Sequence, residues 1–201
     1  MRKVIVSMNV TLDGFVSGPG GELDWHFPLW NEEMSRCACE QLLTMDTILV
    51  GRITYQSMAR HWPTATPSPF GDLMNRLNKV VFSSTLHQPG WNNTRVVAQE
   101  AALEVARLKS MPGKNMVVYG SGSIVACLKA AGLVDEYRIW VHPVVIGKGK
   151  PLFSINDQID LTLLRTKTFG SGVIVLYYQP STLHPSCSNR SHIHGVLRDV
   201  E

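Results

Sequence analysis

The sequence predicts an α/β fold with one mixed, mostly parallel sheet, helices on both faces and an antiparallel hairpin near the C-terminus. Short apolar runs alternate with helical patterns through the first two-thirds of the chain. Runs of this kind are typical of strands buried on both faces, as in parallel sheets. Later in the chain, strand patterns at 161–169 and 173–178 are joined by Gly170-Ser171-Gly172, which indicates a hairpin.

The individual strand and helix signals agree with this class. Asn31 is a favourable N-cap, and Glu32 and Glu33 suit the positive end of a helix dipole, so a helix is expected to begin there. A glycine at 132 is expected to end another helix. Strands are expected at 4–10, 47–50, 79–82, 94–97, 115–119 and 137–141, and further helices at 55–60, 72–78, 100–109 and 123–131.

Composition and charge favour one globular domain. The chain has 201 residues, 44% of them apolar, and a net charge of +3 from scattered Lys and Arg, which does not predict nucleic-acid binding. It has no apolar run of about 18 residues and no export signal, so we expect a cytoplasmic protein without a membrane span. The domain is expected to cover 1–179, and the Ser-, His- and Pro-rich segment 180–201 is expected to be a disordered tail.

The four cysteines indicate reduced thiols rather than a metal site. They lack the paired CxxC spacing that makes zinc binding credible. We therefore expect no metal in this chain.

A strand, a small-residue turn and a helix follow one another around position 120. A turn without bulky side chains lets the backbone approach a ligand, and the free N–H groups of a helix N-terminus suit a phosphate. The segment is neither a Rossmann fingerprint nor a Walker A loop, so an ordinary tight connection explains it equally well. Its candidate ligand-binding residues are Gly120, Ser121, Gly122, Ser123 and Ile124.

Two other strand ends carry polar residues. Gly51 and Arg52 follow one strand and lead into a helix with Thr54, and a guanidinium is well suited to phosphate oxygens. Ser83 and Ser84 follow the next strand. Each could be solvated surface by itself, but all three strand ends are expected at the same edge of the sheet, where α/β proteins bind ligands.

Two loops are candidates for the substrate side. Asp13 precedes a glycine, so it is either a turn residue or part of a loop over a ligand. The segment 23–30 is rich in aromatic residues, and Trp25 and Trp30 could form the wall of a pocket for a planar ring or pack in the core.

Taken in order, these segments resemble the dihydrofolate-reductase superfamily. The likeness is closer to the reductase domain of the bifunctional riboflavin-biosynthesis deaminase-reductase and its stand-alone relatives. It covers about residues 1–179, with two departures: Gly120-Ser121 stands where the family commonly has Gly-Gly, and no deaminase segment adjoins. The matching segments are Ser7 to Phe15, Gly51 to Tyr55, Gly120 to Ile124 with Leu128, Gly132 to Ile139, and His142 to Gly149 with Leu152 and Phe153.

The resemblance implies a three-layer sandwich that binds NADPH. In that family the segment matching Gly51 to Thr54 contacts the adenosine phosphate end, and the segment matching Phe82 to Ser84 lies near the adenine ribose. The segment matching Gly120 to Ile124 holds the pyrophosphate and nicotinamide side. The loop matching Thr11 to Phe15 lies near the reacting ring, and Asn9, in the same matching segment, is included among the cofactor-binding residues.

The implied activity is hydride transfer from NADPH to a small heterocycle, similar to 5-amino-6-ribosylaminouracil phosphate or to a dihydropterin. Asp13 is the first candidate for supplying the proton, and Asp24, Trp25, Trp30 and Glu33 are candidates for binding the substrate. The alternatives are a nucleotide-binding or regulatory relative without catalysis and a purely structural domain.

The last strand pattern also bears on the oligomeric state. Residues 173–178 are apolar on both faces, and the resemblance likewise implies a homodimer built through the C-terminal half of the sheet. A covered interior strand would show the same pattern.

Overall fold

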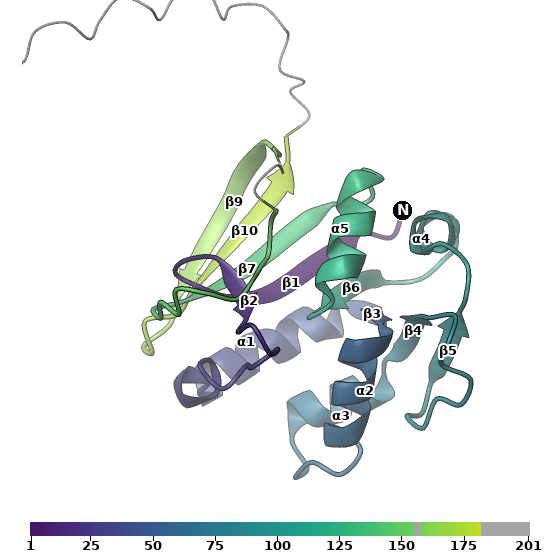
Figure 1. The fold of residues 1–201 in the computed structure, drawn as a ribbon, viewed down its shortest axis with the longest axis horizontal. Helices are drawn as coiled ribbons and strands as arrows, with labels where there is room; N and C mark the ends of the chain where they lie inside the picture. Colours follow the sequence, from purple (N-terminus) through teal and green to yellow (C-terminus); the bar gives the residue numbers. More distant parts are fainter. Residues whose placement is uncertain (155–157, 182–201) are drawn as a thin grey trace, which may run out of the picture.

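The structure is a computed structural model that describes residues 1–154 and 158–181. Its centre is an eight-stranded sheet with the order β5-β4-β3-β6-β1-β7-β10-β9 (Figure 1). A pair of short strands, β2 and β8, lies beside it. The strands are β1 (Val4–Thr11), β2 (Phe15–Ser17), β3 (Met45–Gly51), β4 (Asn78–Phe82), β5 (Thr94–Val97), β6 (Asn115–Tyr119), β7 (Glu136–His142), β8 (Lys150–Pro151), β9 (Leu161–Thr168) and β10 (Ile174–Pro180).

Strand directions confirm the mixed, mostly parallel sheet. The strands from β5 to β7 in the sheet order pair in parallel, whereas β10 is antiparallel to both β7 and β9. The antiparallel pair is the hairpin expected from the glycine loop. Because the parallel strands share one direction, their carboxyl ends lie at one edge of the sheet, where the candidate ligand-binding segments follow them.

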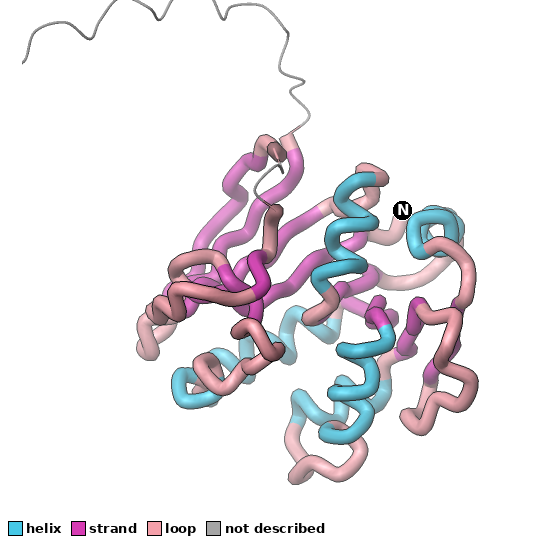
Figure 2. Tube along the Cα trace, in the orientation of Figure 1, coloured by secondary structure: helices cyan, strands magenta, loops and turns pink. Residues whose placement is uncertain are grey.

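Helices cover both faces of the sheet and confirm the three-layer architecture (Figure 2). Apolar side chains of α4 and α5 pack on one face, and those of α1, α2 and α3 pack on the other. The strands between them alternate accordingly, so that Val4, Val6, Met8 and Val10 of β1 face α5. The helices are α1 (Glu32–Leu43), α2 (Arg52–His61), α3 (Pro69–Arg76), α4 (Ala101–Ser110) and α5 (Gly122–Ala130), with a short 3₁₀ helix, η1 (Phe27–Leu29).

Helix α1 begins as the sequence predicts, because the Asn31 side chain accepts a hydrogen bond from the Met34 N–H at 2.9 Å. Helix α2 begins three residues earlier than expected, directly after β3, with Gly51 as its N-cap. Arg52 therefore lies in the first turn of a helix rather than in a loop. This difference matters for the site, because it places the guanidinium at the positive end of the helix dipole.

Strand β10 extends to Pro180, and the Ser181 N–H donates to the Asp160 carbonyl at 2.8 Å. The ordered hairpin thus runs slightly past the domain boundary expected at 179. Of the tail expected at 180–201, residues 182–201 lie outside the described residues.

Two general features of the described ranges bear on the function. No helix among residues 1–154 and 158–181 is both long and apolar enough to cross a membrane. Over the same ranges, Cys37, Cys39 and Cys127 are free thiols, and no group of three or more His, Cys, Asp or Glu side chains could hold a metal ion.

Candidate functional site

The carboxyl ends of β3 and β6 bring together the two segments that resemble a dinucleotide-binding site. The strands are neighbours in the sheet, and the residues that follow them are joined by two hydrogen bonds. The Gly51 N–H donates to the Ser121 hydroxyl at 2.9 Å, and the Thr54 hydroxyl donates to the Gly120 carbonyl at 3.1 Å. The predicted residues Gly51 to Thr54 and Gly120 to Ile124 therefore lie side by side.

The turn at Gly120 requires a glycine for two reasons. Its φ is +67°, in the left-handed region of backbone conformation that residues with a Cβ rarely adopt. A Cβ at this position would also lie 3.1 Å from Thr54 Cγ2. The following residue has a negative φ of −102°, so Ser121 fits where the family commonly has a second glycine. The Ser121 side chain is buried, and its hydroxyl accepts the hydrogen bond from the Gly51 N–H.

Two helix N-termini meet at this edge of the sheet. Helices α2 and α5 begin after Gly51 and Ser121, and neither N-cap residue makes a side-chain hydrogen bond to its helix. The first N–H groups of both helices are therefore free of a side-chain cap, and together with the helix dipoles they favour an anion. Arg52 is exposed in the first turn of α2, with its guanidinium 3.3 Å from Gln56 Oε1. Ser123 is exposed in the first turn of α5.

The third predicted segment follows β4, the neighbour of β3. The Ser83 hydroxyl accepts hydrogen bonds from the backbone N–H groups of Thr85 and Leu86, at 3.1 and 3.0 Å. Ser84 is exposed beside it. The segment thus lies at the same edge of the sheet, next to the end of β3. The Ser83 side chain is occupied by hydrogen bonds within the turn, whereas Ser84 is exposed.

Asp13 holds two loops together. Its carboxylate accepts hydrogen bonds from the backbone N–H groups of Ile146 at 3.2 Å and Gly147 at 2.8 Å. The Thr11 side chain and these backbone donors lower the pKa of the carboxyl. A proton donor near neutral pH needs a raised pKa, so this shift is opposite to the one expected for a catalytic acid.

A buried histidine that the sequence did not single out lies at the end of β7. His142 is 0% exposed, and its Nε2 is 3.2 Å from the Asn9 side-chain oxygen. Burial, with a smaller contribution from His26, lowers its pKa to about 4, so the ring is neutral at physiological pH. Trp25 packs edge-on against it with ring centroids 5.2 Å apart. Only the fold brings together Asn9 and His142, which are 133 positions apart.

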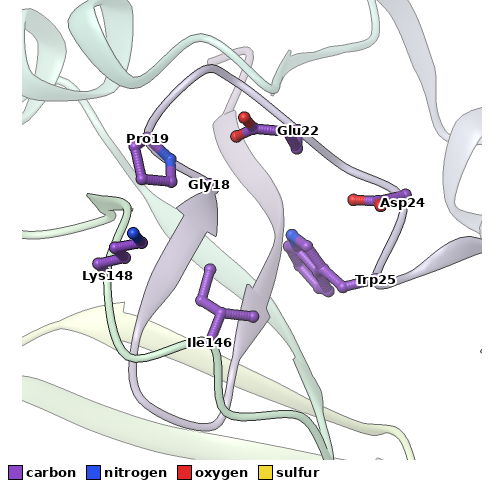
Figure 3. A pocket seen from close by; sticks show the side chains of 7 residues that line it. All are labelled: Gly18, Pro19, Glu22, Asp24, Trp25, Ile146 and Lys148. Carbon is purple, nitrogen blue, oxygen red and sulfur yellow. The ribbon is translucent and has the colours of Figure 1, made fainter.

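The two candidate tryptophans have different surroundings. Trp30 is half-buried between aromatic rings, 6.0 Å from both Trp140 and Phe70 by ring centroids. Trp25 lies on the loop before η1 and lines a pocket of about 370 Å³ (Figure 3). Trp30 thus packs against other aromatic side chains. Trp25 is buried on the side of its ring nitrogen and also lines the pocket.

The two carboxylates proposed for the substrate, those of Asp24 and Glu33, lie in different parts of the structure. Asp24 lines the same pocket as Trp25, together with Glu22 and Lys148 (Figure 3). Glu33 instead accepts a hydrogen bond from the Gly170 N–H at 3.3 Å, in the turn between β9 and β10. The pocket is lined by the loops at 18–25 and 146–148, so it lies apart from the edge formed by α2 and α5.

Solved structures with this architecture include two reductases. The deaminase/5-amino-6-(5-phosphoribosylamino)uracil reductase of Thermotoga maritima aligns with a TM-score of 0.65 at 13% identity, covering 90% of this chain and 57% of that chain. The dihydrofolate reductase of Enterococcus faecalis, solved with NADP(H), aligns with a TM-score of 0.61 at 14% identity, covering 89% and 96% of the two chains. These likenesses show the dihydrofolate-reductase-like fold.

Sequence comparison identifies the family. The protein YyaP of Bacillus subtilis (strain 168) is 36% identical over 182 residues, which cover 88% of this chain and 94% of the relative. The model of the RibD C-terminal domain matches residues 2–175. With a match over most of its length, this chain belongs to the RibD C-terminal domain family.

Proposed function

We propose that this chain binds NADPH along the carboxyl edge of β3, β4 and β6 and reduces a small planar heterocycle. The observation that carries the proposal is the pairing of Gly51 to Thr54 with Gly120 to Ile124, which places two uncapped helix N-termini beside an exposed arginine. The reductases with this fold support the class of reaction, and the solved complex of one of them with NADP(H) supports the cofactor.

Each part of the edge fits a different part of the dinucleotide. The N-terminus of α5, together with the close-approaching turn at Gly120, suits the pyrophosphate. Arg52 and the N-terminus of α2 suit the additional phosphate that distinguishes NADPH from NADH, because a guanidinium binds phosphate oxygens in pairs. Ser84, with Ser83 shaping its turn, suits the adenine ribose. Asn9 lies farther along the edge, next to His142.

The substrate side is formed by the loops over β1 and β7. The bound cofactor would supply the hydride, and the side chains of this chain would orient a heterocycle against it. Trp25 and Asp24 suit this role, because they line a pocket beside the end of β1. A uracil bearing an aminoribosyl phosphate, or a dihydropterin, has the flat, polar ring that such walls accept. Asp13, ionised and bound to Ile146 and Gly147, fixes the loop beside this pocket.

Tryptophan fluorescence tests the proposal, because bound NADPH absorbs light at the wavelengths that tryptophan emits. Adding NADPH is expected to quench the emission with saturation at tens of micromolar or below. With NADPH bound, oxidation of the cofactor is then followed against a panel of uracil, pterin and related heterocycles. Binding without turnover on any member would favour a regulatory relative, and absence of binding would overturn the proposal.

Replacing Arg52 by alanine tests its assignment to the additional phosphate. We expect the affinity for NADPH to fall by about tenfold or more, the loss of one charge-assisted contact, with little change for NADH. Arg60→Ala, in the last turn of the same helix, is the control and should leave both affinities unchanged. An equal loss for NADPH and NADH would remove Arg52 from this role.

We also infer a homodimer built through β9. This strand is at the end of the sheet order, and its residues Leu163 and Leu164 are 50% and 48% exposed. Edge strands with exposed apolar side chains tend to pair with another chain. Sedimentation should show a dimer that Leu164→Glu dissociates, whereas Leu103→Glu, on the exposed face of α4, should leave it intact. A monomeric wild type at micromolar concentration would contradict the inference.

A further inference from the structure

Two buried ring nitrogens lie on neighbouring side chains at the carboxyl ends of β1 and β7. They are the indole Nε1 of Trp25 and the Nδ1 of His142, and within residues 1–154 and 158–181 neither has a hydrogen-bond partner. The two rings meet edge-on at 82°, with their centroids 5.2 Å apart. Buried polar atoms are nearly always paired in folded proteins, so two such atoms on rings in contact point to a group that they bind.

The contacts of His142 define what each nitrogen offers. Its Nε2 lies against the side-chain oxygen of Asn9, which only accepts, so Nε2 carries the ring proton. Burial keeps the imidazole neutral, and Nδ1 is then a hydrogen-bond acceptor. The Trp25 indole N–H is only a donor. The two rings, which are in edge-on contact, thus present one donor and one acceptor.

We propose that Trp25 and His142 bind one planar amide group, the indole N–H donating to its carbonyl oxygen and the imidazole Nδ1 accepting from its N–H. An amide presents this acceptor and donor at adjacent positions in one plane, whereas a water molecule or a hydroxyl presents them at a single atom. The inference rests on the proposed function for its ligand. Both the cofactor and the proposed substrate carry such a group: the nicotinamide has a carboxamide, and a uracil or pterin ring has a lactam.

The place in the fold agrees with either source. β1 lies between β6, which leads into the turn at Gly120, and β7, which ends at His142. Gly120 and His142 are therefore two strand spacings apart across the sheet, roughly 10 Å. They are also offset along β1, because Tyr119 lies opposite Ser7 and His142 lies opposite Thr11. A ring held by the pair would lie over the end of β1, between the cofactor phosphates and the pocket that Trp25 lines.

The pocket that Trp25 lines is the side from which we expect a ligand to approach the two rings. Trp25 is half-buried and forms part of the wall of the pocket of about 370 Å³ (Figure 3). The wall opposite the ring comes from Ile146 and Lys148, on the loop fastened by Asp13. Because both nitrogens are buried, the indole must shift for a ligand in the pocket to reach them.

Two substitutions at position 142 distinguish the loss of the Nδ1 acceptor from general damage to the fold. His142→Gln carries an amide that can reach the place of Nε2, so it keeps a donor for Asn9 and loses the acceptor at Nδ1. His142→Asn has the shorter side chain, which places a polar atom near Nδ1 instead. Trp25→Phe removes the indole N–H and keeps an aromatic ring, and Trp62→Phe is its control, because Trp62 packs away from this site against His61 and Phe70.

The readout is the NMR signal of the Trp25 indole N–H, assigned by its loss in Trp25→Phe. In one arm, NADPH and its acetylpyridine analogue, which keeps the carbonyl and lacks the amide N–H, are added in turn. In the other arm, uracil is added to protein saturated with NADPH. A shift that appears with NADPH assigns the pair to the nicotinamide, and one that appears only with uracil assigns it to the substrate.

The expected result is a downfield shift of this signal in one arm, with an affinity about tenfold weaker in Trp25→Phe and in His142→Gln and unchanged in Trp62→Phe. For the cofactor arm, the acetylpyridine analogue should bind equally well to wild type and His142→Gln. NADPH binding without a shift of the Trp25 signal in either arm would overturn the inference and leave the proposed function standing. Absence of NADPH binding would instead refute the proposed function.

Discussion

Replacing Gly120 with alanine is expected to weaken NADPH binding by at least about tenfold and to lower the free energy of unfolding by about 1–3 kcal/mol. The left-handed backbone at φ +67° disfavours any residue with a Cβ, and the new methyl group would press on Thr54 Cγ2 at 3.1 Å. Relief of this contact is expected to move the turn away from α2, so that the two segments proposed to bind the cofactor lose their relative positions.

Two further variants separate backbone strain from this contact. Gly132 has a similar φ of +64°, but a Cβ there would meet nothing within 4 Å. Gly132→Ala should therefore show the backbone cost alone and bind NADPH normally. Thr54→Ser removes Cγ2 and keeps the hydroxyl that donates to Gly120, so it should restore part of the stability lost in Gly120→Ala. Unchanged NADPH affinity in Gly120→Ala would contradict the role given to this turn.

The stability of the wild type relative to Lys79→Met is expected to rise by about 3 kcal/mol between about pH 8 and about pH 10.4. Lys79 is 0% exposed, and burial lowers its pKa to about 8. The unfolded chain keeps the lysine proton up to about pH 10.4, so in this window the unfolded state binds more protons than the folded state. Stability contributed by this group therefore increases with pH and is smallest below the window.

The local contacts explain why a lysine occupies this position. Its ammonium donates to the carbonyls of Met74 and Asn75 at the end of α3, at 3.2 and 2.9 Å, and lies 4.2 Å from the centroid of the Trp91 ring. Urea unfolding of both proteins on either side of the window measures the difference, and Lys3→Met, at an exposed position, is the control. A difference that does not change with pH would contradict a lowered pKa of Lys79 in the folded protein.

Much of the fold could be predicted from the sequence, because its signals are local. Apolar strands, the Asn31 cap and the glycine loop of the hairpin each act within a few residues, and all are confirmed. Strands β2 and β8 were not predicted, because three and two residues are too short to show a period. Lys79 likewise gave no signal, since its burial depends on how the fold packs the end of α3 and Trp91 around it.

The candidate site was predictable only in part, for the same physical reason. Strand ends with glycine, arginine and serine indicate where a ligand approaches the sheet, and the structure brings the segments at Gly51 and Gly120 together. The fixed contacts of Asp13 and Glu33, in contrast, are with backbone groups of distant loops that no local pattern specifies. His142 became a candidate only when the fold placed it between Asn9 and Trp25.

The proposed NADPH site lies at the edge of the sheet where α2 and α5 begin. The most direct test is an NMR titration of isotope-labelled protein with NADPH, with the shift of each backbone amide followed separately. We expect the largest shifts at the amides of Arg52 to Thr54 and Gly122 to Ile124, with saturation at tens of micromolar or below. No saturable shift, or shifts confined to residues away from both helix N-termini, would contradict it.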